Sequence, residues 1–154
     1  MQGAPEVLAL LNDALRNELT AVHQFLCHAE RLEDWGLMEM SRHERAEAEE
    51  EKGHANLLAQ RILLLGGDPD YTQVGPLVLG EDVPGLLRGD LAIEARARTT
   101  LLQGIRAAET AHDYVSRDLL VGILADEEQH ERHICIELEL IERIGLPNYI
   151  QSKM

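Results

Sequence analysis

Residues 47–58 read EAEEEKGHANLL and residues 123–134 read ILADEEQHERHI. Each stretch holds a Glu-x-x-His pair inside a run of apolar residues at helical spacing, so the polar groups share the core-facing stripe of an amphipathic helix. A buried carboxylate is costly unless a positive partner lies beside it, and no Lys or Arg shares these stripes. The two pairs are Glu51 with His54 and Glu127 with His130.

Two further glutamates repeat the same spacing. Glu18 precedes Glu51 by 33 residues, and Glu94 precedes Glu127 by 33 residues. Residues equidistant from the turn of an antiparallel helical hairpin lie at the same height, and the midpoint of the first pair falls at the turn-like stretch 34–36. The sequence therefore predicts two hairpins whose polar groups meet at one level of a bundle.

The helical periodicity extends over almost the whole chain and predicts an all-α fold with one domain, residues 1–154. Residues 66–81 are rich in Gly and Pro and form a long connection, ~50 Å if extended. A helix of ~28 residues is only ~42 Å long, so this connection can run the length of the bundle. We expect a four-helix bundle with one long crossover and a short fifth helix. The expected helices are approximately 5–34, 37–65, 83–112, 114–144 and 146–152.

Four buried carboxylates are neutralised by two divalent cations. Mixed carboxylate and imidazole ligands suit iron or manganese, and this ligand set is the one described for di-metal four-helix bundles. Carboxylates that follow the same pattern on facing helices can bridge the two ions. The predicted bridging ligands are Glu51 and Glu127, the terminal ligands are Glu18 and Glu94, and His54 and His130 each hold one ion.

The composition excludes several other classes of protein. A net charge of −14 disfavours nucleic-acid binding, which needs Lys and Arg. No stretch of ~20 apolar residues predicts a membrane span, and the N-terminus does not resemble a signal peptide, so the cytoplasm is expected. Cys27 and Cys135 are too few for a disulfide framework, and we expect each to be a small buried or half-buried residue in a reducing compartment.

At this point the sequence resembles the bacterioferritins over essentially its whole length. The stretches that carry the resemblance are Asn17-Glu18-Leu19, Asp34-Trp35-Gly36-Leu37, Gly80-Glu81-Asp82-Val83, 112–118 (HDYVSRD), Asp126-Glu127-Glu128 and Asn148-Tyr149. The resemblance implies a hollow shell of roughly 24 subunits. Such a shell oxidises Fe(II) with dioxygen or peroxide and stores Fe(III) mineral inside. It also implies the ferroxidase ligands Glu18, Glu51, His54, Glu94, Glu127 and His130, and a reductant such as a ferredoxin for iron release.

The chain departs from the bacterioferritin pattern at several positions. Members of the family bind haem b between two subunits through a methionine that follows the second-helix glutamate, and here that residue is Lys52. Haem is therefore not expected in this chain alone, although a second, haem-binding subunit could supply it. Family members often have a His and an Asp that hold an extra iron on the inner surface, and these positions are Ala46 and Glu50 here. The Tyr that lies beside the di-iron site in the family is Phe25 here.

Three functions remain open from the sequence. The first is a ferroxidase and iron-storage subunit. The second is a di-iron or di-manganese redox enzyme that acts on peroxide or an organic substrate. The third is a structural helical protein whose stripe carboxylates are only hydrogen-bonded. Glu44 and Glu47 lie on the same stripe and are equally compatible with guiding iron or with a structural role, and a third Glu-x-x-His pair, Glu109 with His112, is interpreted as solvated.

Overall fold

The computed structural model describes residues 1–154 and is almost entirely helical, with no strand. The helix expected at 37–65 begins at Met38 and ends at Leu64, and the helix expected at 83–112 ends at Thr110. The all-α fold with four long helices and a short fifth one is confirmed. The helices are α1 (Pro5–Asp34), α2 (Met38–Leu64), α3 (Val83–Thr110), α4 (Tyr114–Ile144) and α5 (Leu146–Ser152).

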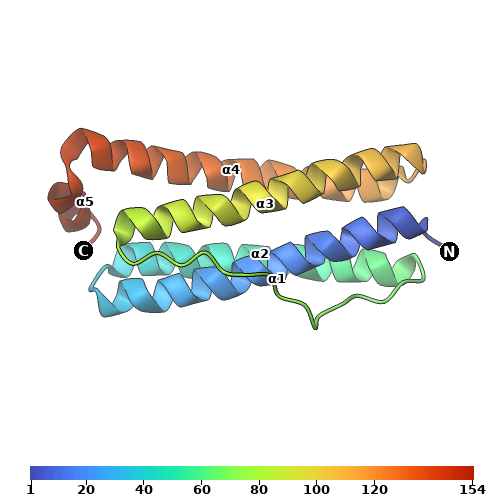
Figure 1. Ribbon diagram of the computed structural model, residues 1–154, viewed down its shortest axis with the longest axis horizontal. Helices are drawn as coiled ribbons and strands as arrows, with labels where there is room; N and C mark the ends of the chain where they lie inside the picture. The colour runs from blue at the N-terminus through green and yellow to red at the C-terminus, as the bar shows by residue number, and fades with distance from the viewer.

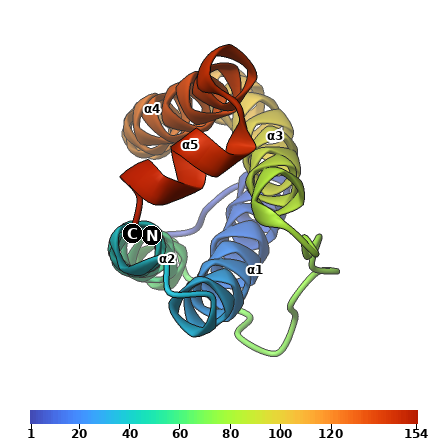
Figure 2. The same ribbon diagram turned by 90° about the vertical axis from the view of Figure 1, so that its left-hand side faces the viewer.

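The helices pair in the order that a single long crossover requires. α1 and α2 run antiparallel, residues 65–82 return along the length of the bundle, and α3 and α4 form a second antiparallel pair (Figure 1). α1 packs along both α2 and α3, whereas α2 and α4 make little direct contact. α5 crosses the end of the bundle from α4 toward α2 (Figure 2). None of the helices is both long enough and apolar enough to span a bilayer.

The first three long helices end in the same way, with one left-handed residue followed by an N–H group that bonds to the carbonyl five residues earlier. This arrangement satisfies carbonyls that the helix leaves unpaired and reverses the chain within a short turn. Glycine takes the left-handed position twice, at Gly36 and Gly66, and His112 takes it at the end of α3 with φ 57°. The closing hydrogen bonds run from Leu37 N to Leu32 O, from Gly67 N to Ile62 O and from Asp113 N to Ala108 O.

The crossover is held against α1 by a row of side chains on one helical face. The crossover lacks regular secondary structure, so its buried N–H groups need side-chain acceptors. Residues 20, 24 and 28 of α1 are four apart and therefore lie one above the other. The hydrogen bonds run from Gly75 N to Thr20 Oγ1 (2.8 Å), from Val78 N to Gln24 Oε1 (2.7 Å) and from Gly80 N to His28 Nε2 (3.2 Å).

The apolar core is divided into two main clusters. One contains Leu11, Leu58 and Leu120, and the other, at the α5 end, contains Leu32, Leu86 and Tyr149. Between them lies a layer of buried polar groups. The expectation for the cysteines was wrong, because Cys27 and Cys135 are both exposed. His28 and Ile134 adjoin the two cysteines in the sequence and occupy the inward positions of their helices, so the thiols face outward.

Candidate di-metal centre

All six predicted ligands lie in the polar layer between the two apolar clusters. Each of the four long helices contributes at least one of them, and α2 and α4 contribute a Glu and a His each because i and i+3 positions share a helix face. The four glutamates are 1 % exposed and the two histidines 5 %. The structure therefore brings together every residue of the predicted site.

The first half of the centre surrounds His54. Its Nδ1 lies 3.6 Å from Glu18 Oε2, 3.6 Å from Glu51 Oε2 and 3.3 Å from Glu127 Oε1. One ligand atom from each of these four residues lies within 4.8 Å of the others. A cation bound here would have three carboxylates and one imidazole within reach.

The second half of the centre surrounds His130 in the same way. Its Nδ1 lies 3.0 Å from Glu51 Oε1, 3.5 Å from Glu94 Oε1 and 3.6 Å from Glu127 Oε2. Glu51 and Glu127 thus present one oxygen to each histidine. Two carboxylates that divide their oxygens between two adjacent positions have the geometry of bridging ligands, which is the role predicted for them.

The donor atoms of the centre lack partners inside the protein. Buried polar atoms are almost always hydrogen-bonded, so a group of unpaired ones needs an explanation such as an ion. Nine buried atoms of the six residues have no hydrogen-bond partner, and all nine are metal-ligand types. They are Glu18 Oε2, both oxygens of Glu51, Glu94 and Glu127, and Nδ1 of His54 and His130. The residues present therefore fit two divalent cations.

Protonated histidines supply the positive charge when no metal is bound. Burial by itself would lower the pKa of His54, but the nearby carboxylates of Glu127 and Glu51 outweigh it and raise the pKa to about 10. Burial would also lower the pKa of His130, but the carboxylates of Glu127 and Glu47 beside it outweigh burial and raise this pKa. Burial also raises the pKa of Glu51. A metal ion that binds here must displace the imidazole protons.

The outward nitrogens of both histidines are held by carboxylates that the sequence did not assign. His54 Nε2 lies 2.8 Å from Asp126 Oδ2, and His130 Nε2 lies 2.9 Å from Glu50 Oε2. Such contacts fix the ring orientation and direct Nδ1 into the centre. Asp126 was overlooked because it is adjacent to Glu127 in sequence and its partner is on another helix, a relation that periodicity does not encode.

Glu44 belongs to a separate buried group and not to the centre. His28 Nδ1 lies 2.8 Å from Asp90 Oδ1, while His28 Nε2 accepts the hydrogen bond from Gly80 N. Burial and the charge of Asp90 raise the pKa of Glu44 well above its usual range. Because both nitrogens of His28 are engaged, this group favours the structural alternative for Glu44.

The comparisons with known proteins agree with this geometry. The family model for the ferritin-like domain matches residues 8–144. The chain is 43 % identical to a bacterial ferritin of Synechocystis over 100 % of its own length and 99 % of that protein. It is also 43 % identical to a bacterial ferritin of Pseudomonas aeruginosa over the full length of both chains. A bacterioferritin of Mycobacterium bovis is 41 % identical over 94 % of this chain and 91 % of its own. This chain therefore belongs to the ferritin-like family, among the bacterial ferritins and bacterioferritins.

Proposed function

We propose that this protein stores iron by oxidising Fe(II) at the centre formed by Glu18, Glu51, His54, Glu94, Glu127 and His130. Similarity to bacterioferritins over nearly the whole chain supports iron storage. The observation that carries the ferroxidase proposal is the division of the Glu51 and Glu127 oxygens between two adjacent positions. The Fe(III) product is deposited inside a shell of roughly 24 subunits.

The proposed reaction balances with two Fe(II) ions for each oxidant molecule. Each Fe(II) gives one electron, and dioxygen takes two electrons and two protons to leave as hydrogen peroxide. If peroxide is the oxidant, the same two electrons and two protons yield two water molecules. Holding both Fe(II) ions between shared carboxylates delivers the two electrons together, which avoids one-electron reduction products.

The surroundings of the centre favour ions over an organic substrate. The cavity beside Glu94 and His130 has a volume of about 70 Å³ and is lined mostly by charged and polar side chains. This volume accommodates several water molecules, at about 10–15 Å³ each. An enzyme acting on an organic molecule would need an apolar pocket of several hundred Å³. The geometry therefore disfavours a di-metal enzyme that acts on an organic substrate.

The test is stopped-flow absorbance of the metal-free protein after mixing with Fe(II) and air. Wild-type protein should show rapid oxidation that saturates at two Fe(II) per subunit, one for each half of the centre. Glu18→Ala and His130→Ala should each abolish this rapid phase while the fold and the assembly persist. Glu109→Ala is the matched control, because Glu109 belongs to the third Glu-x-x-His pair and is exposed.

Light scattering on the same samples separates the alternatives. Rapid oxidation on a particle of roughly 24 subunits supports storage. Rapid oxidation on a small oligomer favours a di-metal redox enzyme. A large shell without oxidation indicates a structural or partner-dependent subunit, and unchanged rates in both ligand variants would refute the assignment of the centre.

A further inference from the structure

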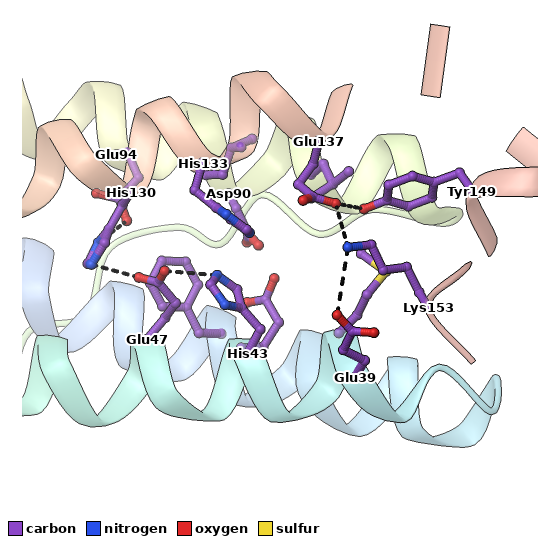
Figure 3. A pocket seen from close by; sticks show the side chains of 15 residues that line it. Glu39, His43, Glu47, Asp90, Glu94, His130, His133, Glu137, Tyr149 and Lys153 are labelled. Atoms are coloured by element: carbon purple, nitrogen blue, oxygen red, sulfur yellow. Dashed lines mark hydrogen bonds and ion pairs between the residues drawn. The ribbon is translucent and has the colours of Figure 1, made fainter. Parts of the chain in front are cut away.

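The cavity beside the centre continues along the facing sides of α2 and α4 toward α5. At one end it reaches Glu94 and His130, and at the other it reaches Tyr149 and Lys153 (Figure 3). Lys153 is the only Lys or Arg in the lining, and it forms an ion pair with Glu137. Its Nζ lies 3.2 Å from Glu137 Oε2. The middle of the cavity is therefore left acidic, without a fixed cation.

Two histidines face each other in this middle section. His43 of α2 and His133 of α4 have ring centroids 4.1 Å apart and ring planes tilted by 31°. Figure 3 shows them between the Glu94–His130 end and the Glu137–Lys153 end of the cavity. The His133 ring makes no hydrogen bond. The histidine rings that do are those of His23, His28, His54, His112 and His130. Both nitrogens of His133 are thus available to a ligand.

Glu47 links this histidine pair to the centre. Its Oε1 lies 3.0 Å from His43 Nε2, and its Oε2 lies 2.8 Å from His130 Nε2. Two ligand atoms that each lie about 2.1 Å from one ion, at right angles, are about 3.0 Å apart. The separation of His43 Nε2 and Glu47 Oε1 therefore already matches that of neighbouring ligands on one first-row metal ion.

We propose that His43, Glu47 and His133 form a third metal position, which takes a divalent first-row transition-metal ion such as Fe(II) between the centre and the α5 end of the cavity. Two imidazoles and one carboxylate are ligands that such ions accept. In the structure the His133 ring faces that of His43, so the His133 side chain would have to rotate to turn one of its nitrogens toward the ion. The His43 side chain is 43 % exposed and that of Glu47 14 %, so the ion could exchange with solvent while it remains next to the buried centre.

The probe is Co(II) soaked into crystals of the full chain, with anomalous scattering measured at the cobalt edge. Wild-type crystals should show peaks at the two positions of the centre and a third peak between His43 and His133. His133→Phe keeps a ring in place but removes both nitrogens, so it should lose only the third peak. His23→Phe is the matched control, because His23 is an exposed histidine on α1 and should leave all three peaks.

The wild-type crystal alone can overturn the proposal. Occupied positions in the centre with no peak beside His43 would refute the third position. A third peak that persists in both His43→Phe and His133→Phe would refute the assigned ligands. A third peak with an empty centre would contradict the proposed ferroxidase function while supporting the third position, so the two proposals fail in distinguishable ways.

Discussion

Glu51 and Glu127 are the only residues that contact Nδ1 of both histidines in the centre. The two halves nevertheless differ in their outer contacts. His54 is backed by Asp126, whose side chain is 49 % exposed, whereas His130 is backed by Glu50 and by Glu47, which is 14 % exposed. Burial alone would raise the pKa of Glu47, but contacts with His130 and His43 outweigh burial and lower this pKa to about 2. The two proposed metal positions are therefore chemically inequivalent.

The raised pKa of His54 predicts a pH-dependent stability of the metal-free protein. The ordinary pKa of histidine is 6.5 and that of His54 in the fold is about 10. A group whose pKa rises on folding stabilises the fold fully below its unfolded pKa and loses this contribution as pH rises through the folded pKa. Thermal unfolding in the presence of a chelator should thus show stability falling between pH 6.5 and 10.

The matched variant for this prediction is His54→Gln, which cannot be protonated. Its stability should lie below that of the wild type near pH 7 and approach it near pH 10. Parallel curves for the two proteins across this range would contradict the raised pKa. Metal-loaded wild type should not follow the same decline, since a bound metal holds the imidazole in its neutral form.

At the scale of elements, α1 has two packing roles. One face contributes Glu18 to the centre, and the row that contains Thr20, Gln24 and His28 anchors the crossover. The crossover also lies close to α3. A Cβ placed on Gly89 would lie 2.1 Å from Val78 O, so only glycine permits this approach.

This contact predicts that Gly89→Ala destabilises the protein. The backbone of the crossover must move away from α3, which costs about 1–3 kcal/mol and outweighs the gain in helix propensity. Gly122 in α4 is the control, because a Cβ there would meet nothing within 4 Å. Gly122→Ala should stabilise the helix by about 0.5–1 kcal/mol. Chemical denaturation at one fixed protein concentration measures both changes, and equal effects would rule out the crowding argument.

At the scale of the whole molecule, the weak contact between α2 and α4 makes room for the cavity. α5 closes one end of it, because Tyr149 donates a hydrogen bond to Glu137 and Lys153 lies 3.8 Å from Glu39 of α2. Several large apolar side chains remain exposed on the single chain, including Leu26, Leu63 and Leu64. An oligomeric assembly, which the family suggests, would offer such side chains a place to be buried.

Lys52 is exposed on α2, and the prediction for this residue concerns haem binding between assembled subunits. The resemblance implies that haem binds between two subunits through a methionine at this position. We expect Lys52→Met to bind haem in the assembled protein, measured as a visible absorption spectrum after reconstitution. Lys52→Ala is the control that removes the charge without adding a ligand. Haem binding by the wild type, or by the alanine variant to the same extent, would show that Lys52 does not decide it.

The sequence by itself determined the four long helices, the crossover and the six residues of the candidate centre. Apolar periodicity is a local property, and the repeated 33-residue spacing places Glu18 level with Glu51, and Glu94 level with Glu127, by the geometry of an antiparallel hairpin. These inferences do not depend on the exact orientation of each helix about its own axis.

Only the tertiary structure decided which carboxylates hold the outer nitrogens of the histidines, and that His43 faces His133. Asp126 reaches His54 from another helix, and Glu47 reaches both His43 and His130. Such contacts depend on the rotation and spacing of α2 relative to α4 and on side-chain rotamers. The exposure of Cys27 and Cys135 has the same origin, because residue type predicts burial only on average, whereas the packed face of each helix fixes it.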